Sequence, residues 1–195
     1  MKNDPAKSPK RNPDSHHADQ TFVLPLLAIL TLRPALGEAS TVVRAEGFEI
    51  FIAAPKGWSV VTKPSLNLGL PAVIVRRGED FNNAKNVMFL NLDRREEPDL
   101  PAFIANRRAS FLKDHPGARI APAKGILAGD GSPATVFDFD DPKIPQYERR
   151  AYLRTADGIV TLFLQCATPG SRTAHAARLA ELVASFRDLH APHPG

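Results

Sequence analysis

The residues that could hold a metal ion gather at one place in the sequence, at Asp138, Asp140 and Asp141. Asp138 and Asp140 alternate with phenylalanines, so a β-strand would project both carboxylates from one face of a sheet. Carboxylate oxygens this close together could bind Ca²⁺, but neither a glycine-turned loop nor a suitably spaced bidentate Glu accompanies them. The competing interpretation, which we favour, is a solvated strand end whose carboxylates pair with Arg149 or Arg150 across a hairpin.

A thiol nucleophile could come only from Cys166, the single cysteine. The alternating Val160, Leu162 and Leu164 place this cysteine on the apolar face of a strand, so we predict a buried and unreactive thiol. The histidines beyond the first forty residues show neither H-x-x-x-H nor H-E-x-x-H spacing, which would put two metal ligands on one helical face. We therefore predict surface histidines at His115, His175, His190 and His193.

Familiar catalytic and nucleotide-binding motifs are missing from the sequence. It contains no P-loop, no G-x-G-x-x-G, no G-x-S-x-G and no C-x-x-C. We therefore predict no catalytic residue and no cofactor-binding residue. Trp58 could be a binding-site aromatic, but the turn at Pro55–Gly57 beside it favours a core anchor.

Composition and charge narrow the class of protein. A chain of 195 residues with 43% hydrophobic and 24% charged residues is typical of one globular domain with a sizeable core. The formal net charge is +4, and most of the Arg-Arg pairs have acids close by in the sequence, as in the run Asp93–Glu97. Nucleic-acid binding calls for a one-signed basic stripe, so we expect a mixed, solvated surface and no nucleic-acid partner.

The beginning of the chain has the features of an export leader. Residues 2–20 are polar and contain prolines, which predicts disorder. The apolar run Phe22–Leu32 has the length of the hydrophobic region of a signal peptide and is too short to span a bilayer. Small residues follow at Ala35 and Gly37, so we expect cleavage just after them. No cysteine lies at this site, so we expect no lipid anchor.

On this interpretation the chain has four parts: a leader over 1–20, a signal region over 21–39, one α+β domain over 40–189 and a tail over 190–195. The mature protein would be periplasmic or secreted, without stable membrane insertion. Two alternatives stay open for residues 22–32. They could form a short buried element of the domain, or remain uncleaved and hold the protein at a membrane surface.

The domain alternates short extended runs with two amphipathic helices. Strands joined by tight turns should pair antiparallel, and each helix must cover a face of the sheet. We predict a twisted antiparallel sheet covered by helices, in the order four strands, helix, four strands, helix. Asp99 is the expected cap of the first helix and Ser171 of the second. The expected strands are 48–52, 58–62, 72–76, 86–92, 118–127, 134–139, 149–154 and 159–167, and Val42–Val43 could begin another.

The segment Gly47–Trp58, GFEIFIAAPKGW, resembles the strand and P-x-G-W opening of the PsbP/DcrB/LpqN group. The run Tyr152–Leu164 and a helix ending at Ala184–Phe186 resemble the C-terminal half of that group. The resemblance covers most of residues 42–187 and implies a PsbP-like α/β sandwich in an exported or lumenal accessory protein. It transfers no functional residue to a numbered position, and shape alone gives no photosynthetic role.

Two functions are open at this stage. The first is an exported, non-enzymatic binding or assembly module that contacts an envelope protein or a small ligand through the loops Gly78–Lys85 or Asp93–Asp99. The alternative is a hydrolase or metal-dependent enzyme whose site assembles only in the fold. Its first candidate residues would be Asp138, Asp140, His115 and His175.

Overall fold

The computed structural model describes residues 39–62, 69–94, 99–144 and 146–191. The predicted leader and all but the last residue of the predicted signal region therefore lie outside the described residues. The described elements are β1 (Ser40–Ala45), β2 (Phe48–Ala53), β3 (Trp58–Val61), β4 (Ala72–Arg76), the short 3-10 helix η1 (Phe81–Asn83), β5 (Asn86–Arg94), α2 (Leu100–Asp114), β6 (Arg119–Pro122), β7 (Ile126–Leu127), β8 (Pro133–Asp141), β9 (Gln146–Arg154), β10 (Gly158–Cys166), α3 (Pro169–Ser185) and β11 (Arg187–Asp188).

Most strands belong to one antiparallel sheet with the order β3-β4-β5-β10-β9-β8-β6, and β7 pairs with β8. A second sheet has the order β1-β2-β11. The predicted antiparallel sheet with two helices is thus present. The predicted order of four strands, helix, four strands, helix is corrected, because β1 precedes the first expected strand, the expected strand 118–127 is divided into β6 and β7, and β11 follows α3.

Local chemistry explains the additional strands. β1 and β2 are joined by the two-residue turn Glu46–Gly47, with φ of 54° and 87°. Two successive positive φ angles give the turn whose twist matches an antiparallel hairpin, and Gly47 adopts its angle without steric cost. The expected strand 118–127 is interrupted over residues 123–125, between β6 and β7, although Ala123 N still donates to Val136 O of β8 at 2.9 Å. β11 consists of two polar residues, so the sequence contains no alternation of apolar residues from which this strand could be predicted.

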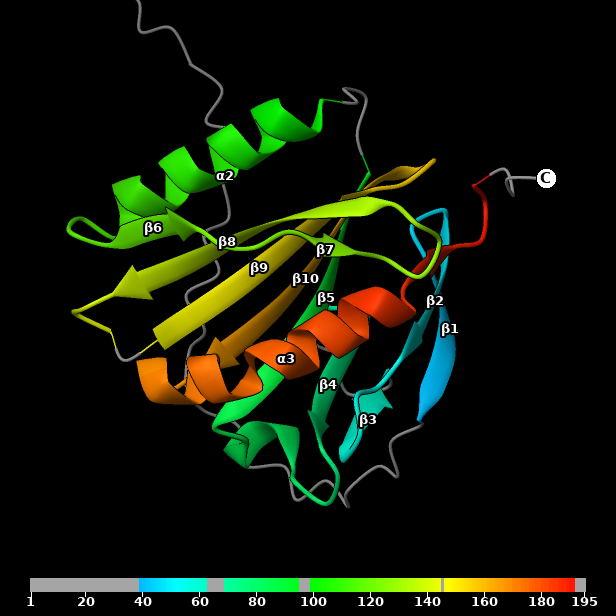
Figure 1. The fold of residues 1–195 in the computed structure, drawn as a ribbon, viewed down its shortest axis with the longest axis horizontal. Coiled ribbons are helices and arrows are strands. Elements are labelled where there is room, and N and C mark those ends of the chain that lie inside the picture. Colours follow the sequence, from blue (N-terminus) through cyan, green and yellow to red (C-terminus); the bar gives the residue numbers. More distant parts are fainter. Residues whose placement is uncertain (1–38, 63–68, 95–98, 145, 192–195) are drawn as a thin grey trace, which may run out of the picture. The chain divides into compact units, whose positions relative to one another are not determined.

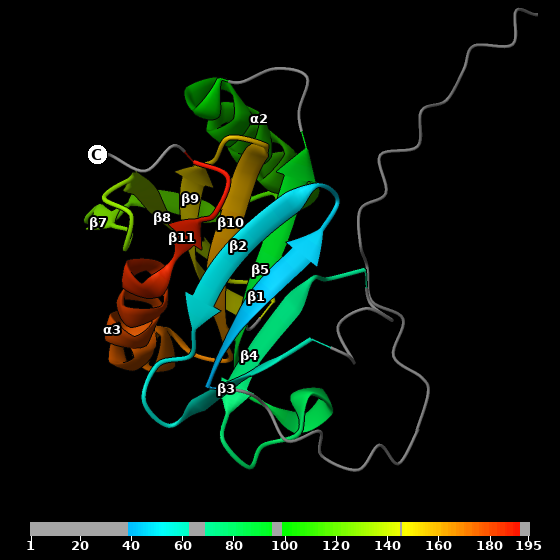
Figure 2. The ribbon, with the colours of Figure 1, turned by 90° about the vertical axis from the view of Figure 1, so that its right-hand side faces the viewer.

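The sheets and helices pack in layers. α3 and the small sheet share one apolar cluster with the large sheet, including Ile50, Leu162 and Leu179. α2 packs on the opposite face through a separate cluster that includes Phe103 and Tyr152. Figure 1 views the side that α3 covers, and Figure 2 shows the β1–β2 hairpin in front of β4 and β5, with β11 beside β2. The central strands are buried on both faces, which explains their nearly continuous apolar runs.

The two helices begin at different kinds of cap. Asp99 occupies the N-cap of α2 as predicted, although its side chain makes no capping hydrogen bond. The predicted cap Ser171 is wrong: α3 begins three residues earlier, where Thr168 Oγ1 accepts a hydrogen bond from Ser171 N and Pro169 fills the first turn. Neither described helix is long and apolar enough to cross a bilayer.

Candidate functional site

Asp138 and Asp140 project from one face of β8, as predicted, and both meet arginines. Arg149 lies opposite Asp138 in the register of β8 and β9, and its Nε and Nη2 donate to the two carboxylate oxygens at 2.7 and 2.8 Å. The pairing predicted for Arg149 is therefore confirmed. Arg172 of α3 adds an ion pair to Asp140 and lies 3.8 Å from Asp138. Hydrogen bonding to Asp138 raises the pKa of Arg149. Two guanidinium groups thus neutralise the two carboxylates.

Asp141 points to the opposite face of β8. Its Oδ1 accepts a hydrogen bond from Lys143 N at 2.8 Å, and its Oδ2 lies 2.9 Å from His115 Nδ1 at the end of α2. The backbone bond from Lys143, followed by the contact with His115, lowers the pKa of Asp141 against the effect of burial. The three candidate aspartates therefore do not converge. Among the described residues, no three His, Cys, Asp or Glu side chains are arranged to hold a metal ion.

Cys166 lies on the apolar face of β10 that packs under α3, and it is 2% exposed. Burial raises the pKa of its thiol to about 11, and Arg172 only partly opposes this. A thiol with that pKa is about one part in 10⁴ thiolate at pH 7. The predicted buried, unreactive cysteine agrees with this placement.

Trp58 is buried in the core, as expected for an anchor beside the turn at Pro55–Gly57. Its ring and that of His175 on α3 form a T-shaped pair, with centroids 5.6 Å apart and planes at 83°. Burial, Arg76 and Arg178 lower the pKa of His175, so this imidazole is neutral at pH 7. His175 therefore serves as a packing partner of the tryptophan.

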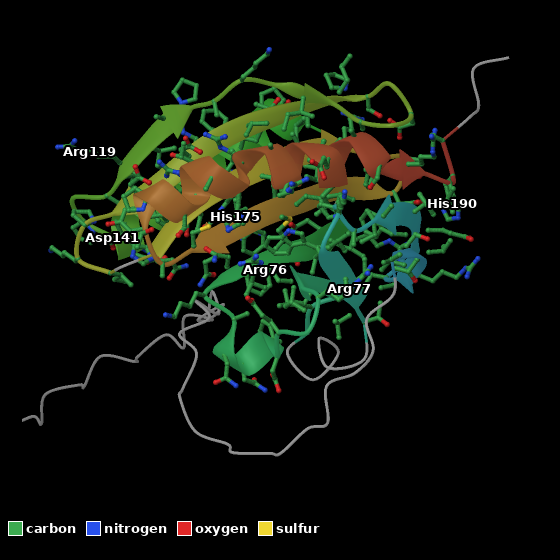
Figure 3. All side chains as sticks on the ribbon, turned by 60° about the horizontal axis from the view of Figure 1, so that its bottom comes forward. Arg76, Arg77, Arg119, Asp141, His175 and His190 are labelled. Atoms are coloured by element: carbon green, nitrogen blue, oxygen red, sulfur yellow. The ribbon has the colours of Figure 1, made fainter. Side chains whose placement is uncertain are left out.

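A cationic surface lies next to His175, where the β2–β3 turn meets the loop between β4 and β5. We define this hairpin-end surface by Lys56, Arg76, Arg77 and Lys85, all of which are exposed. Arg77 N donates to Gly57 O at 2.9 Å, which joins the two connections. Arg76 lies 4.0 Å from Glu79, whereas Lys56, Arg77 and Lys85 have no ion pair within the described part of the chain. Arg76 lies close enough to His175 to affect its pKa, and Figure 3 labels both, with Arg119 at the far left of the domain in that view.

The loop of this surface, predicted as a contact loop over Gly78–Lys85, is locally ordered. Asp80 Oδ1 accepts a hydrogen bond from Asn82 N at 2.9 Å and so caps η1. Phe81 of η1 packs edge-on against Phe89, with centroids 6.0 Å apart. The second predicted loop, Asp93–Asp99, lies largely outside the described residues.

A half-buried cation under α2 was not anticipated. The guanidinium of Arg150 lies 4.3 Å from the ring centre of Phe139, 5.3 Å from that of Phe111 and 5.7 Å from that of Phe163. Its Nε donates to Glu148 Oε2 at 2.6 Å. The alternation of Glu148 and Arg150 along a strand was the available signal, because it places two charged groups on a face that a helix must cover.

The contacts of His190 were also missed. The sequence predicts a tail position for this residue, but its Nδ1 lies 2.7 Å from Asp157 Oδ2. The partner is 33 positions away, so no local pattern could have revealed it.

No protein-family model matches the chain, and no curated protein matches its sequence. Among solved structures, the cyanobacterial PsbP of Synechocystis sp. PCC 6803 superposes with a TM-score of 0.50 at 9% identity, covering 82% of this chain and 98% of that chain. The fold is PsbP-like. A Pseudomonas aeruginosa protein of unknown function, described as a putative regulator, gives a TM-score of 0.41 at 12% identity over 80% and 99% of the two chains. The resemblance noted in the sequence is thus confirmed for the PsbP-like fold.

Proposed function

We propose that this chain is an exported, non-enzymatic accessory module of the PsbP/DcrB/LpqN kind that binds a protein of the cell envelope. The observation that carries the proposal is the PsbP-like fold, since the likeness extends over nearly the whole of the cyanobacterial PsbP. Several proteins of this group act as accessory or assembly factors, and the PsbP-like fold supports a similar role for this domain.

The hairpin-end surface is the proposed contact region. Lys56, Arg77 and Lys85 are exposed cations without an ion pair among the described residues, so a partner could satisfy them without breaking existing bonds. The loop that joins Arg77 to Lys85 is already ordered by the Asp80 cap. A preorganised loop loses less conformational entropy when it binds.

Affinity capture from envelope extracts tests this proposal. The bait is the wild-type protein, and the test variant carries Lys56→Glu with Arg77→Glu. The matched control carries Arg119→Glu with Lys124→Glu, two exposed cations at and just after β6, at the other edge of the large sheet. We expect one partner to be enriched by the wild type and the control, and lost with the test variant. Failure of both wild type and control to enrich any partner would refute the binding function, and equal capture by all three would refute the surface.

Export is tested separately. We propose that the mature protein is periplasmic or secreted, starts near residue 38 and carries no lipid. N-terminal sequencing of the protein isolated from its native host should begin close to that residue. Recovery of a chain that retains residues 22–32 in the membrane fraction would contradict export of a free protein.

The enzymatic alternative is not proposed, because no observation favours it. Asp138 and Asp140 are occupied by arginines, and His175 lies against Trp58. The ring of His115 bonds to Asp141 and stacks on the neighbouring phenylalanine, Phe111, 4.4 Å away, so its described contacts join α2 to β8.

A further inference from the structure

The chain that leaves α3 crosses the edge of the small sheet as a short strap, which we define as residues 187–191. Arg187 and Asp188 pair with Phe51 and Ile50 of β2, and Leu189 N donates to Glu49 O at 2.9 Å. The strap therefore covers the free edge of β2. Polar side chains hold both of its ends, and at the inner end Arg187 Nη1 donates to Gly129 O at 2.8 Å beside the bonds of Asp188.

Asp188 anchors the inner end. It is 5% exposed, and its Oδ2 accepts a hydrogen bond from Ala156 N at 2.8 Å. Its own N–H donates to Asp130 Oδ2 at 3.0 Å, in the turn that precedes β8. Its Oδ1 accepts from His190 N at 3.0 Å. These bonds tie the inner end to the β9–β10 turn and to the turn that precedes β8.

His190 anchors the outer end, between two carboxylates from different parts of the fold. Its Nδ1 lies 2.7 Å from Asp157 Oδ2 in the β9–β10 turn, and its Nε2 lies 3.6 Å from Glu49 Oε2 on β2. Both partners are acceptors only, and a neutral imidazole carries one N–H. Only the protonated ring can therefore direct an N–H at each carboxylate. The side chain is 42% exposed and lines an open hollow of about 360 Å³ at the β1–β2 turn, so protons reach it freely.

We propose that His190 is a proton-dependent lock on the strap, closed by the imidazolium and loosened when the ring loses its second proton. Loosening frees the outer residues from Leu189 onward and uncovers the adjoining edge of β2. Asp188 keeps the inner end in place in both states. This inference is independent of the proposed binding function.

The charged groups around His190 fix the direction of the effect. The hydrogen bond to Asp157 and the charges of Asp157, Glu49 and Asp188 raise the pKa of His190 against the smaller effect of burial. Glu49 is itself paired with Arg44, and the remaining charges nearby are Glu46 in the hollow and Arg94, which lies against Gly47. Histidine is the one side-chain type in this group whose ordinary pKa lies close to neutrality. Its stabilisation of the closed strap is complete below 6.5 and is lost as the pH rises through the raised pKa.

Linkage connects two independent measurements on the full chain. If the ring is released on opening, the opening constant of the outer strap rises tenfold between low and high pH for each unit by which the pKa of His190 exceeds 6.5. NMR titration of the ring supplies the pKa. Amide exchange of Leu189, corrected for intrinsic rates, supplies the opening constant at pH 6 and pH 9. We expect the measured rise in the opening constant to match the rise calculated from the measured pKa of His190.

Variants make the test decisive. Asp157→Asn should bring the pKa of His190 back toward 6.5 and remove most of the pH dependence of exchange at Leu189, whereas the control His175→Gln should change neither. A wild-type pKa at or below 6.5 would overturn the proposal. So would a raised pKa combined with pH-independent opening at Leu189, because the ring would then keep its partners when the strap opens.

Discussion

Neutralising Glu148 should destabilise the domain by stranding a cation. In Glu148→Gln the guanidinium of Arg150 stays beneath α2, between three phenylalanine rings, with no counter-charge. Arg150 remains ionised because an arginine does not lose its proton in a protein. The variant therefore carries a largely buried, unpaired charge, while the shape of the side chain is unchanged.

The expected loss follows from how deeply the pair is buried. The side chain of Glu148 is 4% exposed and that of Arg150 is 21% exposed. Removing one partner of a fully buried pair costs about 3–5 kcal/mol, and the partial exposure of Arg150 places this case near the lower figure, at about 3 kcal/mol. The double variant Glu148→Gln with Arg150→Met removes the charge and leaves an unbranched apolar chain among the rings. It should recover most of the loss and end within about 1.5 kcal/mol of the wild type.

Urea unfolding followed by circular dichroism measures these differences, with equal m-values as the check that the transitions are comparable. Two results would refute the reasoning. One is a loss below about 1 kcal/mol for Glu148→Gln, which would mean that the rings alone hold the cation. The other is a double variant no more stable than the single one, which would mean that packing rather than charge sets the cost.

Three further predictions concern other parts of the domain. Native Cys166 should react with a thiol reagent only as fast as the protein unfolds, since burial raises its pKa to about 11; rapid labelling of folded protein at pH 8 would contradict this. Gly158→Ala should lower the free energy of unfolding by at least about 2 kcal/mol, because φ is 156° and the new Cβ would lie 2.4 Å from Asp93 O. The control Gly131→Ala, where a new Cβ meets open space, should lower it by about 1 kcal/mol. Equal losses in urea unfolding would contradict the steric argument. Burial opposes ionisation of Asp130, but hydrogen bonds from a serine hydroxyl and from backbone N–H groups outweigh burial and lower the pKa of Asp130. Asp130 therefore stabilises the fold above pH 3.8, and this stabilisation is lost as the pH falls further. Asp130→Asn should make the free energy of unfolding less dependent on pH in this acid range, and an unchanged dependence would contradict the role of Asp130.

The sequence predicted most accurately those features that depend on neighbours along the chain. Alternation along β10 placed Cys166 in the core, and alternation along β8 gave Asp138 and Asp140 a common face with Arg149 across the hairpin. These inferences succeed because a strand turns successive side chains to opposite sides whatever the rest of the fold does.

The features that were missed depend on contacts between distant segments or on backbone chemistry without an apolar period. β11 is stabilised by pairing with β2 and by the bonds of Asp188, not by its own composition. The α3 cap went to Thr168 because its hydroxyl precedes a proline, which fits the first helical turn better than the interior. Arg172 reaches Asp140 from 32 positions away, so the neutralisation of the predicted metal candidates could be learned only from the fold.

The short strand β6 has a consequence for how copies of this protein behave at high concentration. It forms one outer edge of the large sheet, spans four residues, carries the exposed cation Arg119 and ends at Pro122, which has no N–H to offer. A positive charge and a missing donor on an edge strand discourage the edge-to-edge pairing that starts β-aggregation. Concentrated solutions should therefore resist fibril formation along this edge, and replacing Arg119 and Pro122 by valine should remove that resistance.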